Sequence, residues 1–346
     1  MEKTYNIIGN YMGVWVEPAG NNTITLKNSI TDTSANQLPV YYTLDFSTFN
    51  KLEKNETAVI NQRAYLYYYS GWRSVGSQTD GGFDIIGNYN IGGVIVNHRG
   101  KNEEYHKILP YMNIGKSAQT YLISAKNLVI KSANISSKFK DCVNLVYGPE
   151  IKRAGDAYNH VDIHDIFKGC TSLIEIPDIT LSGNINRITA DSMCEGCTSL
   201  IKAPKIKVNN TTEESVILSF VYAFKDCTAL NDIPDSLFSS VIDNCTVNNM
   251  YCGSMFKGCT SLEKLPVLPT LNSTSSNTIN YVSMFEDCSK IKISETETGS
   301  YVNEYSINVT GLTSRVGLWD MFTNTGGTFT GTPTINTTYY TSNEVK

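Results

Sequence analysis

The sequence predicts a β-rich, α+β chain in which a small antiparallel β-domain precedes a solenoid. One short line centred on a cysteine recurs at a nearly constant interval over residues 139–291. A period of about 20 to 50 residues is typical of solenoids, whose coils bury their apolar sides against one another. Residues 1–120 contain no copy of this line. They hold short alternating runs of β-branched and aromatic residues, which favour antiparallel strands.

The clearest copy of the repeated line covers residues 255–266 and reads MFKGCTSLEKLP. Strong copies cover 167–177, 193–204 and 224–234, and weaker ones begin at Phe139 and Met284. The equivalent cysteines are Cys142, Cys170, Cys197, Cys227, Cys259 and Cys288, with steps of 28, 27, 30, 32 and 29 residues.

Each repeat is expected to have three pieces. A short helical turn comes first, and a Gly or Asp in the left-handed conformation ends it. The Cys and Leu then turn inward along a short strand, which the following Pro ends because it lacks an amide hydrogen. A variable polar segment completes the coil. Loss of an inward Phe or Leu should cost about 2–5 kcal/mol.

The nine cysteines suggest either a disulfide framework or buried thiols. Six of them share one position in the repeat, which favours a ladder of buried thiols. Cys194 and Cys197 have the spacing of a zinc or redox pair, but no second such pair exists to complete a four-ligand site. The disulfide status of Cys245 and Cys252 stays open.

Composition limits the classes of partner. The net charge of −5 argues against a nucleic-acid binder, which would carry a basic stripe. No run of eighteen apolar residues exists, so we expect no membrane span. The N-terminus has no basic stretch followed by an apolar run, so no signal peptide is visible.

The four strong copies resemble the BspA-like leucine-rich repeat family, whose units carry Phe-x-Gly-Cys-Thr-Ser-Leu and then a Pro-ended strand. Trp319 and residues 326–329 are similar to the closing segment of such proteins from gut bacteria and their phages. Residues 40–49 are similar to part of the β-domain that often precedes the array. Together with the change of pattern along the chain, the resemblance predicts a β-domain at 1–120 and a leucine-rich-repeat solenoid with a C-terminal cap at 121–335. Residues 336–346 form a tail of polar composition.

The family includes cell-surface adhesins and virion proteins of tailed phages, and it supplies no catalytic residues. Because no signal peptide is visible, we expect a phage virion component: a fibre, spike or capsid decoration that recognises a host or surface. The alternative is a bacterial cell-surface adhesin that binds a host protein or glycan, and a glycan-active enzyme ranks third. The expected partners are other virion proteins or a host surface protein or glycan, and a homo-oligomer is an option.

Two stretches are candidate contact surfaces. Aromatic side chains with polar tips suit protein interfaces or sugar stacking, although strand alternation should place some of them in the core. They gather at Tyr65, Tyr67, Tyr69 and Trp72. The repeat strands offer variable positions, which are also what any solvent-facing strand needs. These positions are Glu175, Lys202, Asp232 and Lys264.

His160, Asp162 and His164 have side chains of the types that bind metal ions, and on an extended strand they would share one face. The alternative is a polar segment with solvated side chains, and this is the interpretation we favour. No Ser/His/Asp motif or phosphate-binding glycine loop can be placed in the sequence. The sequence therefore predicts a non-enzymatic protein without metal or cofactor.

Overall fold

The computed structural model describes residues 14–29, 40–69, 82–96, 108–110, 118–131, 135–153, 159–209, 215–234, 237, 246–264, 266, 278–291, 316–317 and 320–325. The chain divides into two compact units. The first comprises Met1–Ser132 and Asn144–Glu150, and the second comprises Ala133–Val143 and Ile151–Lys346. The predicted β-rich fold class is confirmed, because the only helix among the described residues is α1 (Ala118–Tyr121).

The first unit is built mainly from antiparallel strands. Its larger sheet follows the order β10-β8-β1-β6-β3-β4, with β9 paired to β6. The bounds are β10 (Leu122–Lys131), β8 (Tyr89–Val96), β1 (Val14–Pro18), β6 (Ala64–Tyr69), β3 (Val40–Thr43), β4 (Asn50–Leu52) and β9 (Ile108–Pro110). β10 is the exception, since it pairs in parallel with β8. A smaller sheet has the order β5-β2-β7, with β5 (Thr57–Ile60), β2 (Ile24–Asn28) and β7 (Phe83–Ile86).

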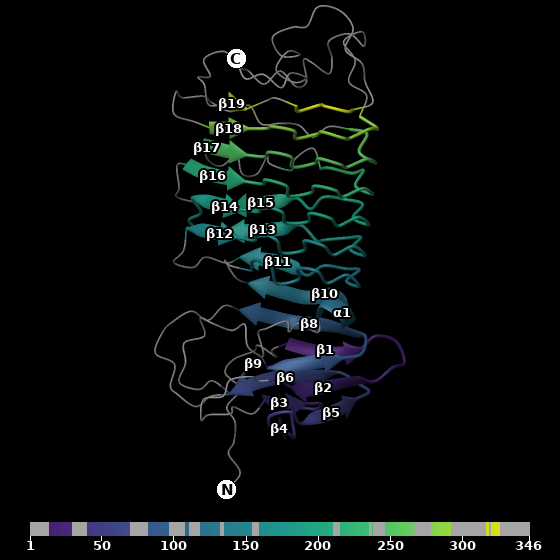
Figure 1. Ribbon diagram of the computed structural model, residues 1–346. Helices are drawn as coiled ribbons and strands as arrows, with labels where there is room; N and C mark the ends of the chain where they lie inside the picture. Colours follow the sequence, from purple (N-terminus) through teal and green to yellow (C-terminus); the bar gives the residue numbers. More distant parts are fainter. Residues whose placement is uncertain are drawn as a thin grey trace, which may run out of the picture. The chain divides into compact units, whose positions relative to one another are not determined.

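The second unit is a β-solenoid, and its successive rungs are visible in Figure 1. One parallel sheet runs through β12-β14-β16-β17-β18-β19, and another runs through β11-β13-β15. The first sheet contains β12 (His160–Asp162), β14 (Arg187–Thr189), β16 (Ser215–Ser219), β17 (Thr246–Tyr251), β18 (Thr278–Asn280) and β19 (Val316–Gly317). The second contains β11 (Glu150–Arg153), β13 (Ile179–Ser182) and β15 (Ile206–Asn209).

Two expectations for the coil are wrong. The strand of the second sheet follows the proline: β13 begins two residues after Pro177, and β15 begins two residues after Pro204. The proline therefore precedes the strand, where its missing amide hydrogen breaks no ladder. The segment before each cysteine is also not helical; it is a chain of hydrogen-bonded turns.

The turn segment at 192–197 shows why it is not a helix. Every second amide donates to the next coil: Ser192 to the Val221 carbonyl at 2.8 Å, Cys194 to Ala223 at 2.7 Å, and Gly196 to Lys225 at 2.8 Å. The amides between them bond within the turn three residues back, as Glu195 does to Ser192 at 3.2 Å. A helix would direct all these amides four residues back along its own axis.

Left-handed backbone produces this alternation. Two residues in each turn segment, five before and one before the cysteine position, have φ between 52° and 76°. The sequence predicted the second of these positions but not the first. The first-position residues are Ser137, Asp165, Ser192, Tyr222, Ser254, Ser283 and Asp320. The second-position residues are Asp141, Gly169, Gly196, Asp226, Gly258, Asp287 and Asn324.

Stacked phenylalanines form one ladder of the solenoid core. The rings of Phe224, Phe256, Phe285 and Phe322 follow one another at centroid distances of 5.5, 5.6 and 5.5 Å, with planes within 6° of parallel. Cys194 occupies the equivalent position in its own coil and is fully buried, so it interrupts the ladder. The bulky Phe220 lies buried in the next coil.

The predicted ladder of thiols is confirmed for the described cysteines, which are buried and free. Five of these thiols, from Cys170 to Cys288 at the repeated position, also donate to a carbonyl in the preceding coil, as Cys197 Sγ does to Phe167 at 3.0 Å and Cys259 Sγ to Phe224 at 3.1 Å. A thiol is therefore more than a small apolar filler here. Cys245 lies outside the described residues, and Cys252 is buried as a free thiol.

An aspartate just before the cysteine position in one coil leaves no room for a side chain at the equivalent position of the next coil. A Cβ added to Gly169 would lie only 2.4 Å from Asp141 Oδ1, and one added to Gly258 would lie 2.5 Å from Asp226 Oδ1. Gly196 follows another glycine, and a Cβ there would meet nothing nearer than 4.0 Å.

We therefore expect Gly169→Ala to destabilise the protein more than Gly196→Ala. Both residues share a left-handed φ of about 75°, so both changes carry the same strain of about 1–2 kcal/mol. Only Gly169→Ala also displaces a carboxylate, that of Asp141. Adding Asp141→Gly should therefore remove the part of the destabilisation that comes from this clash. Urea unfolding of Gly169→Ala, of Gly196→Ala and of the double variant Asp141→Gly/Gly169→Ala measures these free energies. Equal losses of stability in Gly169→Ala and Gly196→Ala would contradict the role of the aspartate.

The thiols also predict how stability depends on pH. Burial raises the pKa of Cys142 and of Cys288 from 9.0 to about 12, and it raises the pKa of Cys170, Cys227 and Cys259 as well. Below pH 9 these thiols are protonated in both states, so their contribution is constant. Above pH 9 only the unfolded chain releases the protons, and the stability falls until the folded pKa is reached.

We expect the free energy of unfolding to fall above pH 9 by about 1.4 kcal/mol per pH unit for each such thiol. Denaturant unfolding between pH 7.5 and 10 measures the slope, with Cys142→Ala as the control that lowers it by one thiol. A flat profile above pH 9 would show that these thiols are open to solvent.

Candidate binding surfaces

The four repeat residues predicted as contacts form one exposed row. Glu175, Lys202, Asp232 and Lys264 each lie five residues after the cysteine of their coil, and all four are exposed. Lys202 and Asp232 face each other across a parallel bridge, and Lys202 Nζ lies 2.8 Å from Asp232 Oδ2. The charge alternates from coil to coil along this row, which we call the charge row.

A row of threonine hydroxyls, at Thr171, Thr198, Thr228 and Thr260, lies four residues before the charge row. Three of the hydroxyls donate to the threonine carbonyl of the preceding coil: Thr198 to Thr171 at 3.3 Å, Thr228 to Thr198 at 3.3 Å, and Thr260 to Thr228 at 3.5 Å. These threonines are exposed. Their hydroxyls thus fix the spacing of the coils at the surface and leave methyl groups and oxygen lone pairs to the solvent.

Between these two rows the side chains vary in polarity. The residues just before the charge row are Ile174, Ile201, Asn231 and Glu263. Ile201 is 49% exposed and so presents an aliphatic surface beside the charge row. The backbone is thus regular while the side chains it presents differ from coil to coil.

Ion pairs tie the turn segments together on another row. Glu195 Oε2 lies 2.8 Å from Lys168 Nζ in the preceding coil, and Glu195 Oε1 lies 3.6 Å from Lys225 Nζ in the next coil. Partial burial alone would raise the Glu195 pKa, but hydrogen bonds from Lys168 and Ser192 outweigh it and lower the pKa. Lys257 and Glu286 repeat the contact at 2.7 Å.

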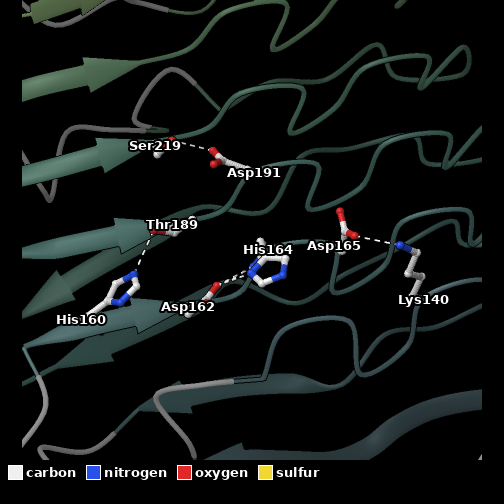
Figure 2. Close-up of polar contacts among 8 residues, drawn as sticks. All are labelled: Lys140, His160, Asp162, His164, Asp165, Thr189, Asp191 and Ser219. Carbon is white, nitrogen blue, oxygen red and sulfur yellow. Dashed lines mark hydrogen bonds and ion pairs between the residues drawn. The ribbon is translucent and has the colours of Figure 1, made fainter.

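Of the predicted His/Asp/His alternative, His160 and Asp162 lie on β12, whereas His164 lies in the turn segment that follows, so the three residues do not share one strand. Figure 2 shows that the two imidazoles have different partners. His164 Nδ1 lies 2.6 Å from Asp162 Oδ1, whereas His160 Nε2 lies 2.9 Å from Thr189 Oγ1 on β14. Burial lowers the His160 pKa, although the Asp162 charge opposes this. Within the described ranges, no three His, Cys, Asp or Glu side chains are arranged to hold a metal ion.

Other polar groups near β12 link neighbouring coils, also shown in Figure 2. Asp191 Oδ1 accepts hydrogen bonds from Ser219 Oγ at 2.6 Å and from the Val221 amide at 3.0 Å. Lys140 Nζ donates to Asp165 Oδ2 at 2.9 Å. Sequence reasoning missed these contacts, because the position of Asp191 carries Val221, Gly253 and Val282 in the following coils and so shows no recurring polar residue.

The aromatic stretch of the first unit is divided between core and surface. Tyr67 is only 2% exposed, so the predicted contact role is wrong for this residue; burial raises its pKa to about 12. Its ring packs edge-on against Phe49 at 5.4 Å. Tyr69 is in β6, and Trp72 lies outside the described residues.

Tyr65 belongs to an aromatic and arginine cluster that the sequence did not reveal. Its ring lies 4.3 Å from that of Phe46, and the opposite residue on β1 is Trp15. The Arg63 guanidinium stacks over Trp15 at 3.8 Å and donates two hydrogen bonds to Glu17, at 3.0 and 2.9 Å. A cation over an indole face is a favourable contact.

Gly92 explains how the indole fits. A Cβ at this position would lie 2.1 Å from Trp15 Cζ2, so the ring occupies the space that a side chain would fill. The pair of glycines in β8 was therefore a signal for a large neighbour on the adjacent strand.

Comparison with family models, curated proteins and solved structures gave no match. Of the residues that the structure describes, none belongs to a helix with the length and hydropathy needed to cross a membrane.

We expect the charge row to contribute little to folding. Lys202→Ala and Asp232→Ala should each change the free energy of unfolding by less than about 1 kcal/mol, because their side chains are 57% and 50% exposed. A double-mutant cycle by urea unfolding measures the coupling. A coupling above about 2 kcal/mol would show that the pair is structural and unsuited to contact variants.

Proposed function

We propose that this chain is a non-enzymatic structural and binding protein, carried on a phage virion as a fibre, spike or capsid decoration, whose solenoid recognises a host or another surface. The observation that carries the proposal is the contrast within each coil. The backbone, the thiols and the threonine row repeat, while the exposed residues beside them change from Ile201 to Asn231 to Glu263. A rigid scaffold with varied exposed side chains suits recognition.

The resemblance of the repeated line to the BspA-like leucine-rich repeat family supports the same function. Members of that family act at surfaces, as virion proteins or as adhesins. In our proposal the first unit attaches the chain to other virion proteins. The charge row and Ile201 face a host surface protein or glycan.

The alternative is a bacterial cell-surface adhesin with the same binding surface. A glycan-active enzyme ranks third, because several of the carboxylates described above are already engaged in contacts between coils. Glu195, for example, lies between two lysines, and Asp191 accepts two hydrogen bonds. Such groups are positioned to hold the stack together.

Location is tested by mass spectrometry of purified virions from the source phage or prophage. We expect peptides of this chain in stoichiometric amounts after density-gradient purification. Recovery of the chain only with bacterial envelopes would support the adhesin and contradict the virion assignment.

Recognition is tested with a variant that removes the charge row: Glu175→Ala, Lys202→Ala, Asp232→Ala and Lys264→Ala together. We expect at least about a tenfold loss of binding of the full chain to host cells, measured by flow cytometry. The matched control carries Lys207→Ala and Asp178→Ala, which remove an exposed ion pair elsewhere on the solenoid. Its Lys207 Nζ and Asp178 Oδ2 atoms lie 3.0 Å apart. Equal binding by both variants would contradict the assignment of this surface.

A further inference from the structure

Among the residues that the structure describes, nothing protects the β5 edge of the three-stranded sheet in the first unit. β5 lies at the end of the order β5-β2-β7, and Figure 1 shows it beside β2. Its residues read TAVI, with no charge and no proline in the strand. Val59 is 70% exposed, the largest exposure of any described bulky apolar residue.

The hydrogen bonds of β2 show which backbone groups of β5 face outward. The Asn28 amide donates to the Glu56 carbonyl at 3.1 Å, and Leu26 lies opposite Ala58 in the same ladder. Alternation along an antiparallel pair then directs the amide and carbonyl of Thr57 and Val59 away from β2. These four groups have no hydrogen-bond partner in the part of the chain that the structure describes.

Other edge strands of this unit carry the usual protection. β4 presents the exposed Lys51, which pairs with Glu53, and β7 carries Asp84. Charged side chains of this kind oppose the addition of a further strand. β5 lacks such a residue. An exposed apolar strand whose outward amides have no partner readily accepts another strand.

We propose that a second copy of this chain pairs with β5, edge to edge and antiparallel, so that two three-stranded sheets join into one. The segment is self-complementary about Ala58. A two-fold axis through Ala58 places Thr57 opposite Val59 of the second copy and Val59 opposite its Thr57, so all four outward groups on each copy are satisfied. No like charges meet in this register, and the small Ala58 lies opposite itself.

The inference goes beyond the proposed function, because it concerns assembly and holds for a virion protein or an adhesin alike. It makes the chain a symmetric dimer with one isologous contact. Two solenoids on one particle would then be linked through their first units. Virion location and host binding can fail while this contact stands.

Crosslinking tests the register. Ala58 and its symmetry mate form a non-hydrogen-bonded pair, whose Cα atoms lie about 4.5 Å apart, within the range of about 4.4–6.8 Å that a disulfide spans. We expect Ala58→Cys in the full chain to become a disulfide-linked dimer under mild oxidation, seen on non-reducing gels and reversed by reductant. The control is Ile86→Cys, on the exposed face of β7, which should stay monomeric on the gel.

Light scattering after size exclusion supplies a second measurement that does not depend on cysteine. The unmodified chain should have twice the monomer mass, and Val59→Pro should halve it, because proline removes an outward amide without breaking the bonds to β2. Its thermal unfolding should match that of the unmodified chain. A monomeric unmodified chain, equal crosslinking by Ile86→Cys, or a folded Val59→Pro that stays dimeric would each overturn the inference.

Discussion

The alternating direction of amides in the turn segments is the constraint on which the solenoid depends. Two left-handed residues per turn rotate the backbone so that every second amide reaches the next coil. This fixes the register between coils outside the two sheets. In that register phenylalanine stacks on phenylalanine, and five of the thiols donate to a carbonyl of the preceding coil. Asp141, Asp226 and Asp287 each lie against a glycine or asparagine of the next coil.

The same register organises the surface. Since each coil repeats the path of the one before, residues five positions after the cysteine form a straight row even though repeat lengths differ. The extra residues of longer repeats fall outside the turn segment and the threonine row. Function can therefore vary at the surface without disturbing the contacts that hold the stack, and this separation is the physical basis of our functional proposal.

Much of this solenoid was predictable from the spacing of one line. The period gave the coils, the shared position gave the buried thiols, and glycine in three of the repeats indicated the left-handed residue before the cysteine. The other left-handed position escaped because it carries Ser, Asp and even Tyr222, which share no backbone preference. The turn resembled a helix in sequence because both end in a left-handed glycine.

Tertiary packing explains the remaining differences. The strand follows the proline, and there Ile179 and Ile206 lie opposite each other in parallel pairing. Strand alternation alone could not show that Tyr67 is buried, since Phe49 from a neighbouring segment covers it. The carboxylates that link the coils were invisible because their partners lie about thirty residues away, as with Asp191 and Val221.

Scalar couplings across hydrogen bonds test the central claim most directly. In a deuterated sample, nuclear magnetic resonance can detect which carbonyl accepts the amide of Cys194. The account predicts a coupling from Cys194 to the Ala223 carbonyl in the next coil, with Ser192 coupled to Val221 and Gly196 to Lys225. A coupling from Cys194 to Ala190, four residues back in its own coil, would show a helical turn and contradict the account.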